Sequence, residues 1–246
     1  MKRNLNKYED EYINQPYEKY QVNFRKKKII EILGNYNHKT TLEIGCGLES
    51  IFHAYNTFDK LIILEPGLKF YEKAKIDIEK NGLNNIEIFN LYLEDSLELL
   101  SNFKFDFIII SSLLHEIPNP KLFLSIIKKI SNSNTVIHIN VPNANSFHRL
   151  LAVEMGLINS VFELSKNNLN FQQQNVFDIK KLVNIVQDLD FKIIESFSYS
   201  FKPFTHNQMQ KMLDSKLLTE EMLEGFYKLE NKLPGIGSEI GINIKL

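Results

Sequence analysis

The sequence predicts one α/β domain built on an open, mostly parallel β-sheet. Short apolar runs typical of β-strands alternate with helical segments from residue 40 to residue 142. A glycine turn, Gly45-Cys46-Gly47, follows the first run, and Glu65 closes the second run 20 residues after Gly45. Ligands bind at the carboxyl ends of the strands in such a sheet, so these two strand ends mark the expected site. A chain of 246 residues is long enough for a single large domain, 1–246, with an additional cap.

The first half of the chain supplies three strands and their helices. Aromatic and aliphatic residues at helical spacing predict a helix over residues 17–33, which ends at Gly34. The other elements expected here are a strand at 41–44, a short helix at 51–58, a strand at 61–64, a helix at 69–80, and a third strand that starts at Ile86 and continues to 93–95.

The second half completes the sheet. Residues 105–110 are apolar enough to form a fourth strand buried on both faces. Asn119 is expected to cap a helix that has Pro120 in its first position, and Asp178 to cap the last regular helix. The remaining strands are expected at 135–141, 191–201 and 238–246.

The N-terminal region, 1–39, is expected to combine an arm with the first helix. Residues 1–16 are polar and have no clear period, which indicates a mobile arm or a flap over the site. The basic run Arg25-Lys26-Lys27-Lys28 lies inside the helix. A solvated helix face is favoured for this run over a site for a polyanion.

Composition excludes several classes of protein. The chain has 29 basic and 30 acidic residues, a net charge of −1, so no overall field favours nucleic acid. The single cysteine, Cys46, cannot form an internal disulfide and is expected to fill a tight turn rather than act as a nucleophile. The sequence shows neither a signal-peptide core nor an uninterrupted apolar run of membrane-spanning length. A cytoplasmic, soluble protein without a membrane partner is therefore expected.

The residues around the glycine turn favour one kind of nucleoside. A dinucleotide site requires G-x-G-x-x-G, but Ser50 occupies the third glycine position and Glu49 would repel a pyrophosphate. Glu43 adds a second acid before the turn. S-adenosylmethionine has an ammonium, a sulfonium and a ribose diol but no phosphate, so acidic residues suit it.

At this point the chain resembles the class I S-adenosylmethionine-dependent methyltransferases, whose first motif is acid-x-Gly-x-Gly-x-Gly. Glu43, Gly45 and Gly47 match the motif, while Glu49 stands in place of its last glycine. The resemblance implies a Rossmann-like, seven-stranded, mostly parallel sheet with an antiparallel last strand, helical lid insertions, and S-adenosylmethionine as cofactor. It also implies that the cofactor is bound by Glu43, Gly45, Cys46, Gly47, Glu65, Pro66, Leu93, Glu94 and Ser111.

Two long insertions are expected to hold the methyl acceptor. Segments 143–177 and 202–237 follow the fifth and sixth strands, and insertions of this length in compact domains are usually functional lids. Three histidines are candidates for catalysis: His148 as the base, His115 framing the transfer centre, and His206 near the acceptor. A base of ordinary pKa would make the rate rise through about pH 6 to 7. The expected acceptor contacts are Asn143, Arg149 and Lys202.

The segments PNANSFHRLL, KPFTH and GSEI resemble methyltransferases of bacterial surface-polysaccharide and capsule clusters. This resemblance implies O-methylation of a small acceptor, such as a nucleotide sugar or a phosphate- or phosphoramidate-type capsule precursor. Residue spacing does not choose among these acceptors, and it leaves the oligomeric state open.

Other functions remain as alternatives. A non-catalytic nucleoside-binding or assembly protein would keep the turn without an acceptor pocket. A nicotinamide dehydrogenase would need the missing third glycine. A nucleic-acid acceptor is disfavoured because the chain has no basic domain. The sequence contains no cysteine spacing for a metal site, so none is expected.

Overall fold

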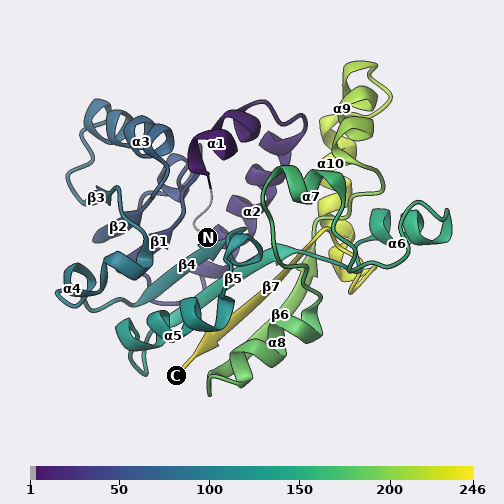
Figure 1. The fold of residues 1–246 in the computed structure, drawn as a ribbon. Helices are drawn as coiled ribbons and strands as arrows, with labels where there is room; N and C mark the ends of the chain where they lie inside the picture. The colour runs from purple at the N-terminus through teal and green to yellow at the C-terminus, as the bar shows by residue number, and fades with distance from the viewer. Residues whose placement is uncertain (1–3) are drawn as a thin grey trace.

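A computed structural model describes residues 4–246 as a seven-stranded sheet flanked by helices (Figure 1). The strands are β1 (Thr40–Ile44), β2 (Lys60–Leu64), β3 (Ile86–Phe89), β4 (Phe107–Ser111), β5 (Val136–Pro142), β6 (Lys192–Tyr199) and β7 (Glu239–Lys245). Their order is β3-β2-β1-β4-β5-β7-β6. Six strands run in the same direction, and β7 alone is reversed, lying antiparallel between β5 and β6. The predicted fold, including the antiparallel last strand, is confirmed.

Strand order reverses between β1 and β4, which places the predicted site at a topological switch point. β1 pairs with β2 on one side and with β4 on the other, while the chain continues outward from β2 to β3 and from β4 to β5. Helices that follow the strands cross in opposite directions from such a point and leave a crevice at the carboxyl ends. The glycine turn after β1 opens into that crevice.

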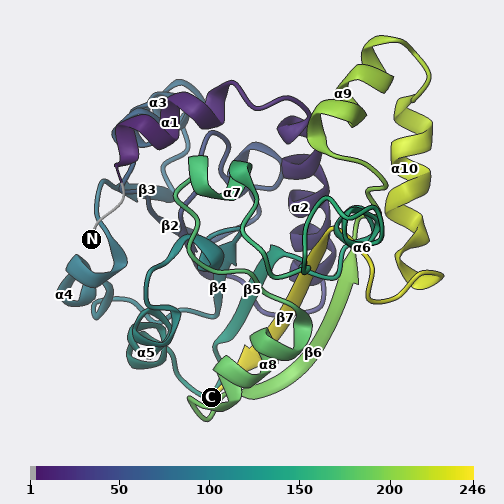
Figure 2. The ribbon, with the colours of Figure 1, turned by 45° about the vertical axis from the view of Figure 1, so that its right-hand side comes forward.

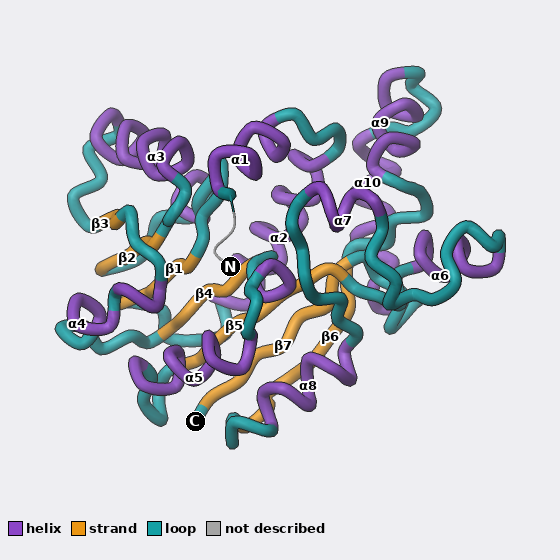
Figure 3. Tube along the Cα trace, viewed as in Figure 1, coloured by secondary structure: helices purple, strands orange, loops and turns teal. Residues whose placement is uncertain are grey.

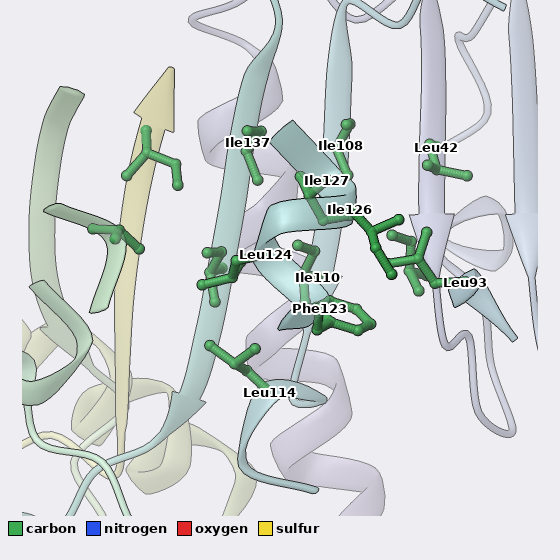
Figure 4. Close-up of a cluster of buried hydrophobic side chains, with 14 of the residues drawn as sticks. Leu42, Leu93, Ile108, Ile110, Leu114, Phe123, Leu124, Ile126, Ile127 and Ile137 are labelled. Carbon is green, nitrogen blue, oxygen red and sulfur yellow. The ribbon is translucent and has the colours of Figure 1, made fainter. Parts of the chain in front are cut away.

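Alternating positions along the strands form two separate cores. Leu42, Ile108 and Ile137 point to one face, where they pack with α4 (Leu97–Leu100), α5 (Pro120–Ile130) and α8 (Ile179–Gln187). Figure 4 shows α5 side chains meeting those of the strands on this face. Leu61 and Ile109 point to the other face, beneath α2 (Glu18–Leu33) and α3 (Leu68–Lys80). The period of two along buried strands thus divides the apolar residues between the layers.

The N-terminal segment contains a helix that the sequence did not predict. Residues 5–13 form a helix, α1 (Leu5–Ile13), whereas residues 1–3 lie outside the described part of the chain. The side chain of Asn4 accepts the amide of Lys7 and caps this helix. Figure 2 shows α1 lying next to α3. The polar sequence contains no signal for the helix because its apolar side is formed by a few aromatic residues, which pack on Phe70 of α3.

Two other local expectations were wrong. The predicted helix at 51–58 is only a short 3-10 turn, η1 (Ile51–His53), and β3 ends at Phe89 instead of reaching 93–95. Residues 93–95 form a second 3-10 turn, η2 (Leu93–Asp95). Both segments are too short for local preferences to fix their conformation, so tertiary contacts decide it.

The two insertions each contain two α-helices and lie beyond the carboxyl end of β5 (Figures 1 and 3). The first, 143–177, contains α6 (Phe147–Glu154) and α7 (Lys166–Asn170). The second, 202–237, contains α9 (His206–Asp214), α10 (Glu220–Lys228) and the 3-10 turn η4 (Leu229–Asn231). A further 3-10 turn, η3 (Leu114–Glu116), follows β4. Among residues 4–246, no helix is long and apolar enough to cross a membrane.

The basic run in α2 is not the solvated face that was expected. The side chains of Arg25, Lys26 and Lys28 are buried. Each basic residue of the run pairs with an acid from elsewhere in the fold or from α2 itself; the pairs are Arg25 with Glu18 and Glu239, Lys26 with Glu49, Lys27 with Glu224, and Lys28 with Glu31 and Glu230. Ion pairs from α2 therefore connect it to β7, to the second insertion and to the loop after β1.

We expect Arg25→Ala to lower the free energy of unfolding by about 3–5 kcal/mol, because it leaves buried carboxylates without their partner. Lys27→Ala, in the same helix, removes a half-exposed pair and should cost at most about 1 kcal/mol. Urea unfolding of both variants measures the difference. Equal losses would contradict the structural role of Arg25.

Candidate cofactor and acceptor site

A cavity of about 280 Å³ lies at the carboxyl ends of the central strands, between α1, α2 and the two insertions. Most of the residues predicted from the sequence line it together: Glu43, Gly45, Cys46, Gly47, Glu65, Pro66, Ser111, His115, Asn143, His148, Arg149, Lys202 and His206. Segments up to 163 positions apart, such as Glu43 and His206, thus meet in one space.

The glycine turn after β1 requires glycine for its backbone. Gly45 and Gly47 have φ angles of +76° and +57°, a backbone region that residues with a Cβ atom rarely adopt. A Cβ at Gly45 would also lie 3.3 Å from the Leu113 side chain. The turn therefore keeps its backbone open to the cavity, as a close cofactor contact needs.

The acids near the turn have partners that the sequence did not reveal. Glu43 accepts hydrogen bonds from the Ser50 hydroxyl and from the amide of Ile51, at 3.0 Å, and so fixes the loop. Burial raises the pKa of Glu43 to about 7. Glu49, which replaces the third glycine of the motif, turns toward α2 and pairs with Lys26 at 2.7 Å. The departure from the motif is thus accommodated by an ion pair.

Glu65 joins the two loops that follow β1 and β2. Its Oε2 accepts the amide of Gly47 at 2.9 Å, and its Oε1 accepts the amide of Gly67 at 2.7 Å. Burial, the largest cause, raises the pKa of Glu65 to about 7. Each oxygen retains a lone pair, so the carboxylate can still accept hydrogen bonds from a diol.

Cys46 behaves as the predicted filler of the turn. Its side chain is buried, and burial followed by the charge of Glu65 raises the pKa of the thiol well above its ordinary value. The neutral thiol is a poor nucleophile.

Two predicted cofactor residues are not among the residues lining this cavity. Leu93 is buried in the core beneath the sheet, and Glu94 is exposed. Their contact with an adenine stays a prediction. Ser111, at the end of β4, does line the cavity.

The end of the cavity formed by Glu18, Lys202 and His206, called here the acceptor end, contains a series of polar groups close to one another. Lys202 is buried, and its Nζ lies 3.3 Å from Nδ1 of His206. Nε2 of His206 lies 3.4 Å from Oε2 of Glu18. Burial lowers the pKa of Lys202 to about 8 and that of His206 to about 4.

His148 stands beside this chain. Burial, then the charge of Lys202, lowers the pKa of His148 well below its ordinary value, and the backbone of Lys202 accepts a hydrogen bond from the ring. Nδ1 of His148 is buried without a hydrogen-bond partner among the described residues. The imidazole is therefore neutral, with an unused nitrogen at the cavity.

Two predicted acceptor contacts have structural partners instead. Asn143 donates to the carbonyl oxygens of Gly235 and Gly237, at 3.0 and 2.8 Å, and accepts the amide of Asn145. These bonds join the two insertions and give Asn143 a structural role, while its contact with an acceptor stays a prediction. Arg149 donates to the carbonyl oxygens of Val161 and Glu163. It lines the cavity but has two of its five donors committed to a loop.

His115 is buried after β4, and its carbonyl oxygen accepts the amides of Gln174 and Asn175. The histidine thereby connects the strand-four loop with the first insertion. Its placement at the cavity agrees with a framing role, and its ring remains a candidate for contact with the acceptor.

Sequence reasoning missed the acids and aromatic residues that complete the cavity. Glu18 accepts a hydrogen bond from Tyr12 and pairs with Arg25, which also pairs with Glu239 of β7. The pKa of Glu18 is lowered to about 2; burial opposes this shift, and the charge of Arg25 is its largest cause. Glu239 lies 214 positions from Arg25, and the spacings of six and seven residues from Glu18 to Tyr12 and Arg25 are not a helical pairing pattern, so no local signal marked these residues.

These features fit S-adenosylmethionine. The positive-φ turn at Gly45 and Gly47 allows close backbone approach, and Glu65 offers lone pairs for a ribose diol at the end of the neighbouring strand. Acidic groups dominate this end of the cavity, as suits a cationic ligand. Within residues 4–246, no group of three or more potential metal-binding side chains is present.

Comparison with known proteins agrees with this geometry. A family model described as a methyltransferase domain matches residues 17–196. No curated protein sequence gives a significant match.

Several solved structures share the fold at low identity. A methyltransferase from Thermotoga maritima, described as a possible histamine N-methyltransferase, has a TM-score of 0.58 at 15% identity and covers 93% of both chains. A possible sarcosine dimethylglycine methyltransferase from Galdieria sulphuraria has a TM-score of 0.58 at 12% identity, covering 89% of this chain and 83% of its own. The plantazolicin methyltransferase BamL, solved with S-adenosylhomocysteine, has a TM-score of 0.57 at 16% identity, covering 93% and 90%.

The family match covers most of the chain, and the strand order and the glycine turn agree with it. The chain belongs to the methyltransferase domain family.

Proposed function

We propose that this protein transfers a methyl group to a hydroxyl oxygen of a small acceptor, with His148 as the general base. The observation that carries the proposal is the buried, unpartnered Nδ1 of His148 at the cavity. A neutral imidazole in this position can accept the proton that a hydroxyl loses as its oxygen is methylated.

The chain's own residues divide the remaining work. When bound, S-adenosylmethionine supplies an electrophilic methyl group on a sulfonium. The turn at Gly45 to Gly47 and the carboxylate of Glu65 would hold it at the β1 and β2 ends. The two insertions and α1 enclose the cavity and limit the access of water, so the main demand on the protein is to orient the acceptor.

The acceptor end favours a substrate with an anionic group. Lys202 is buried, has no carboxylate within ion-pair distance among the described residues, and has Nζ donors beyond the one directed at His206. An ammonium in this setting binds phosphate or carboxylate strongly. A nucleotide sugar, or a phosphate- or phosphoramidate-type capsule precursor, has the required combination of hydroxyl and anion.

Mass spectrometry of the protein with S-adenosylmethionine and a panel of nucleotide sugars and capsule precursors tests this function. The expected result is an acceptor heavier by one methyl group. If the cofactor binds but no acceptor in the panel or in a cell extract is methylated, the proposal of a catalytic acceptor site fails in favour of a nucleoside-binding protein.

Glu65→Ala should weaken binding of S-adenosylhomocysteine roughly tenfold or more, because it removes a charge-assisted acceptor worth about 1.5–3 kcal/mol. Glu87→Ala removes an exposed carboxylate from β3, where it pairs with Lys60, and should leave the affinity unchanged. Isothermal calorimetry measures both. An unchanged Kd for Glu65→Ala would place the ribose elsewhere.

His148→Ala should lower kcat by about 10²-fold or more and leave the Kd of S-adenosylhomocysteine nearly unchanged, because the base acts on the acceptor. His53→Ala is the matched control, since His53 pairs with Asp77 outside the cavity. Steady-state kinetics with the identified acceptor measures the effect. Near-normal kcat in His148→Ala, with a loss in His115→Ala or His206→Ala, would move the base to another loop.

The pH profile should differ from that of an ordinary histidine. Because the pKa of His148 is lowered, its ring is already unprotonated at neutral pH, so kcat/KM should increase with pH only below the ordinary histidine pKa of 6.5. This corrects the sequence-based expectation of a rise through about pH 6 to 7. Lys202→Met removes a positive charge that lowers this pKa and should move the rise to higher pH. In the wild type, kcat/KM should fall again as pH rises through about 8, the pKa of Lys202, because Lys202 then loses the charge that binds the acceptor's anion. A wild-type rise centred near pH 6.5 would contradict the assignment.

A further inference from the structure

Glu9 of α1 caps a helix that cannot cap itself. Its side chain is completely buried, and its Oε1 accepts the amides of Lys69 and Phe70 at 2.9 and 3.3 Å. These amides belong to the first turn of α3, whose N-cap residue, Gly67, has no side chain for the purpose. Free amides at a helix start are satisfied well by a carboxylate, which also suits the positive end of the helix dipole.

The same carboxylate approaches the cofactor-binding Glu65 across Gly67. A Cβ at Gly67 would lie 2.7 Å from Oε1 of Glu9 and 2.9 Å from Oε1 of Glu65. The φ angle of Gly67 is −70°, so the backbone itself would tolerate a side chain. Space for the two carboxylates is therefore the reason for glycine here.

Aromatic contacts extend this attachment over the cavity. Tyr8 and Tyr12 of α1 both pack edge-on against Phe70, and Tyr8 also meets Phe171 of the first insertion. Both tyrosines line the cavity. Helix α1 thus covers the cavity from the start of α3 to the first insertion.

We propose that Glu9 is a positioning residue of the cofactor site, which holds Gly67 and Glu65 in place and fastens α1 over the bound nucleoside. The inference rests on S-adenosylmethionine as the cofactor. It gives the N-terminal helix a direct part in cofactor affinity.

The charge of Glu9 provides a readout that a purely structural role would not give. The groups facing Glu65 are the amides of Gly47 and Gly67, the thiol of Cys46, and the carboxylate of Glu9. Burial and the charge of Glu9 raise the pKa of Glu65, whereas the two amides and the thiol lower it. Protonated Glu65 is a weaker acceptor for ribose hydroxyls, so binding should weaken as pH falls below about 7.

The first test is Glu9→Gln, which keeps an oxygen acceptor for the α3 amides and removes the charge. The affinity of the full chain for S-adenosylhomocysteine is measured by calorimetry from about pH 5.5 to about pH 8.5. The expected result is that binding by the variant weakens at a lower pH than binding by the wild type. An identical pH dependence would overturn the proposal.

A second variant tests the geometry independently of charge. Gly67→Ala inserts a methyl group between the two carboxylates and should weaken S-adenosylhomocysteine binding about tenfold. Gly225→Ala is the matched control, because a Cβ at that helical position meets nothing within 4 Å. Equal affinity in both variants would contradict the role of the Glu9–Gly67–Glu65 contact.

Amide hydrogen exchange gives a third test, which measures the capping of α3 directly and does not depend on ligand affinity. Glu9→Ala should speed exchange at the amides of Lys69 and Phe70, whereas Asp10→Asn, which removes only an exposed pair with Lys69, should not. Unchanged exchange in Glu9→Ala would overturn the proposal. These measurements do not depend on methyl transfer, so they remain valid if His148 is not the base. If the wild type does not bind S-adenosylhomocysteine, both the choice of cofactor and this inference are rejected.

Discussion

The site depends on the pairing of Arg25 with two carboxylates from opposite ends of the chain. Nε of Arg25 donates to Glu239 at 3.2 Å, and its NH1 group donates to Glu18 at 3.0 Å. The pairing joins α2 to β7, the strand inserted between β5 and β6. Because Arg25 and Glu239 are buried and Glu18 is largely buried, each charge would be costly without the others, and their arrangement is strongly specified.

This pairing extends into the acceptor end through Glu18. The carboxylate also accepts a hydrogen bond from Tyr12 of α1 and lies near His206 of α9, which in turn approaches Lys202. One ionised group therefore places an N-terminal helix and a C-terminal insertion around the same cavity. The base proposed here, His148, is neutral because it is buried beside Lys202.

The cofactor end follows a different electrostatic principle. Burial raises the pKa values of Glu43 and Glu65 from 4.5 to about 7. The folded chain therefore binds these protons more tightly than the unfolded chain, and the two groups reduce stability as pH rises from about 4.5 to about 7. Hydrogen bonds from a ribose to ionised Glu65 would offset part of this cost, which links cofactor binding to stability.

The sequence by itself determined the sheet, the glycine turn and a set of site residues, most of which line the cavity. Buried strands, caps such as Asn119 and Asp178, and the positive-φ glycines depend on neighbours within a few residues, so their pattern is local. The class of cofactor followed because Glu43 and Glu65 stand at strand ends whose position the topology fixes.

Only the tertiary structure decided the parts that depend on distant partners. The basic run of α2 is buried because acids from β7, α10 and the glycine loop reach it. Residues 5–13 are helical because α3 and the first insertion provide surfaces for a few aromatic side chains. Asn143 and Glu9 received their roles from loops and a helix start that no local pattern connects to them. Long-range contacts of this kind arise from the whole fold, and a single sequence contains no local signal for them.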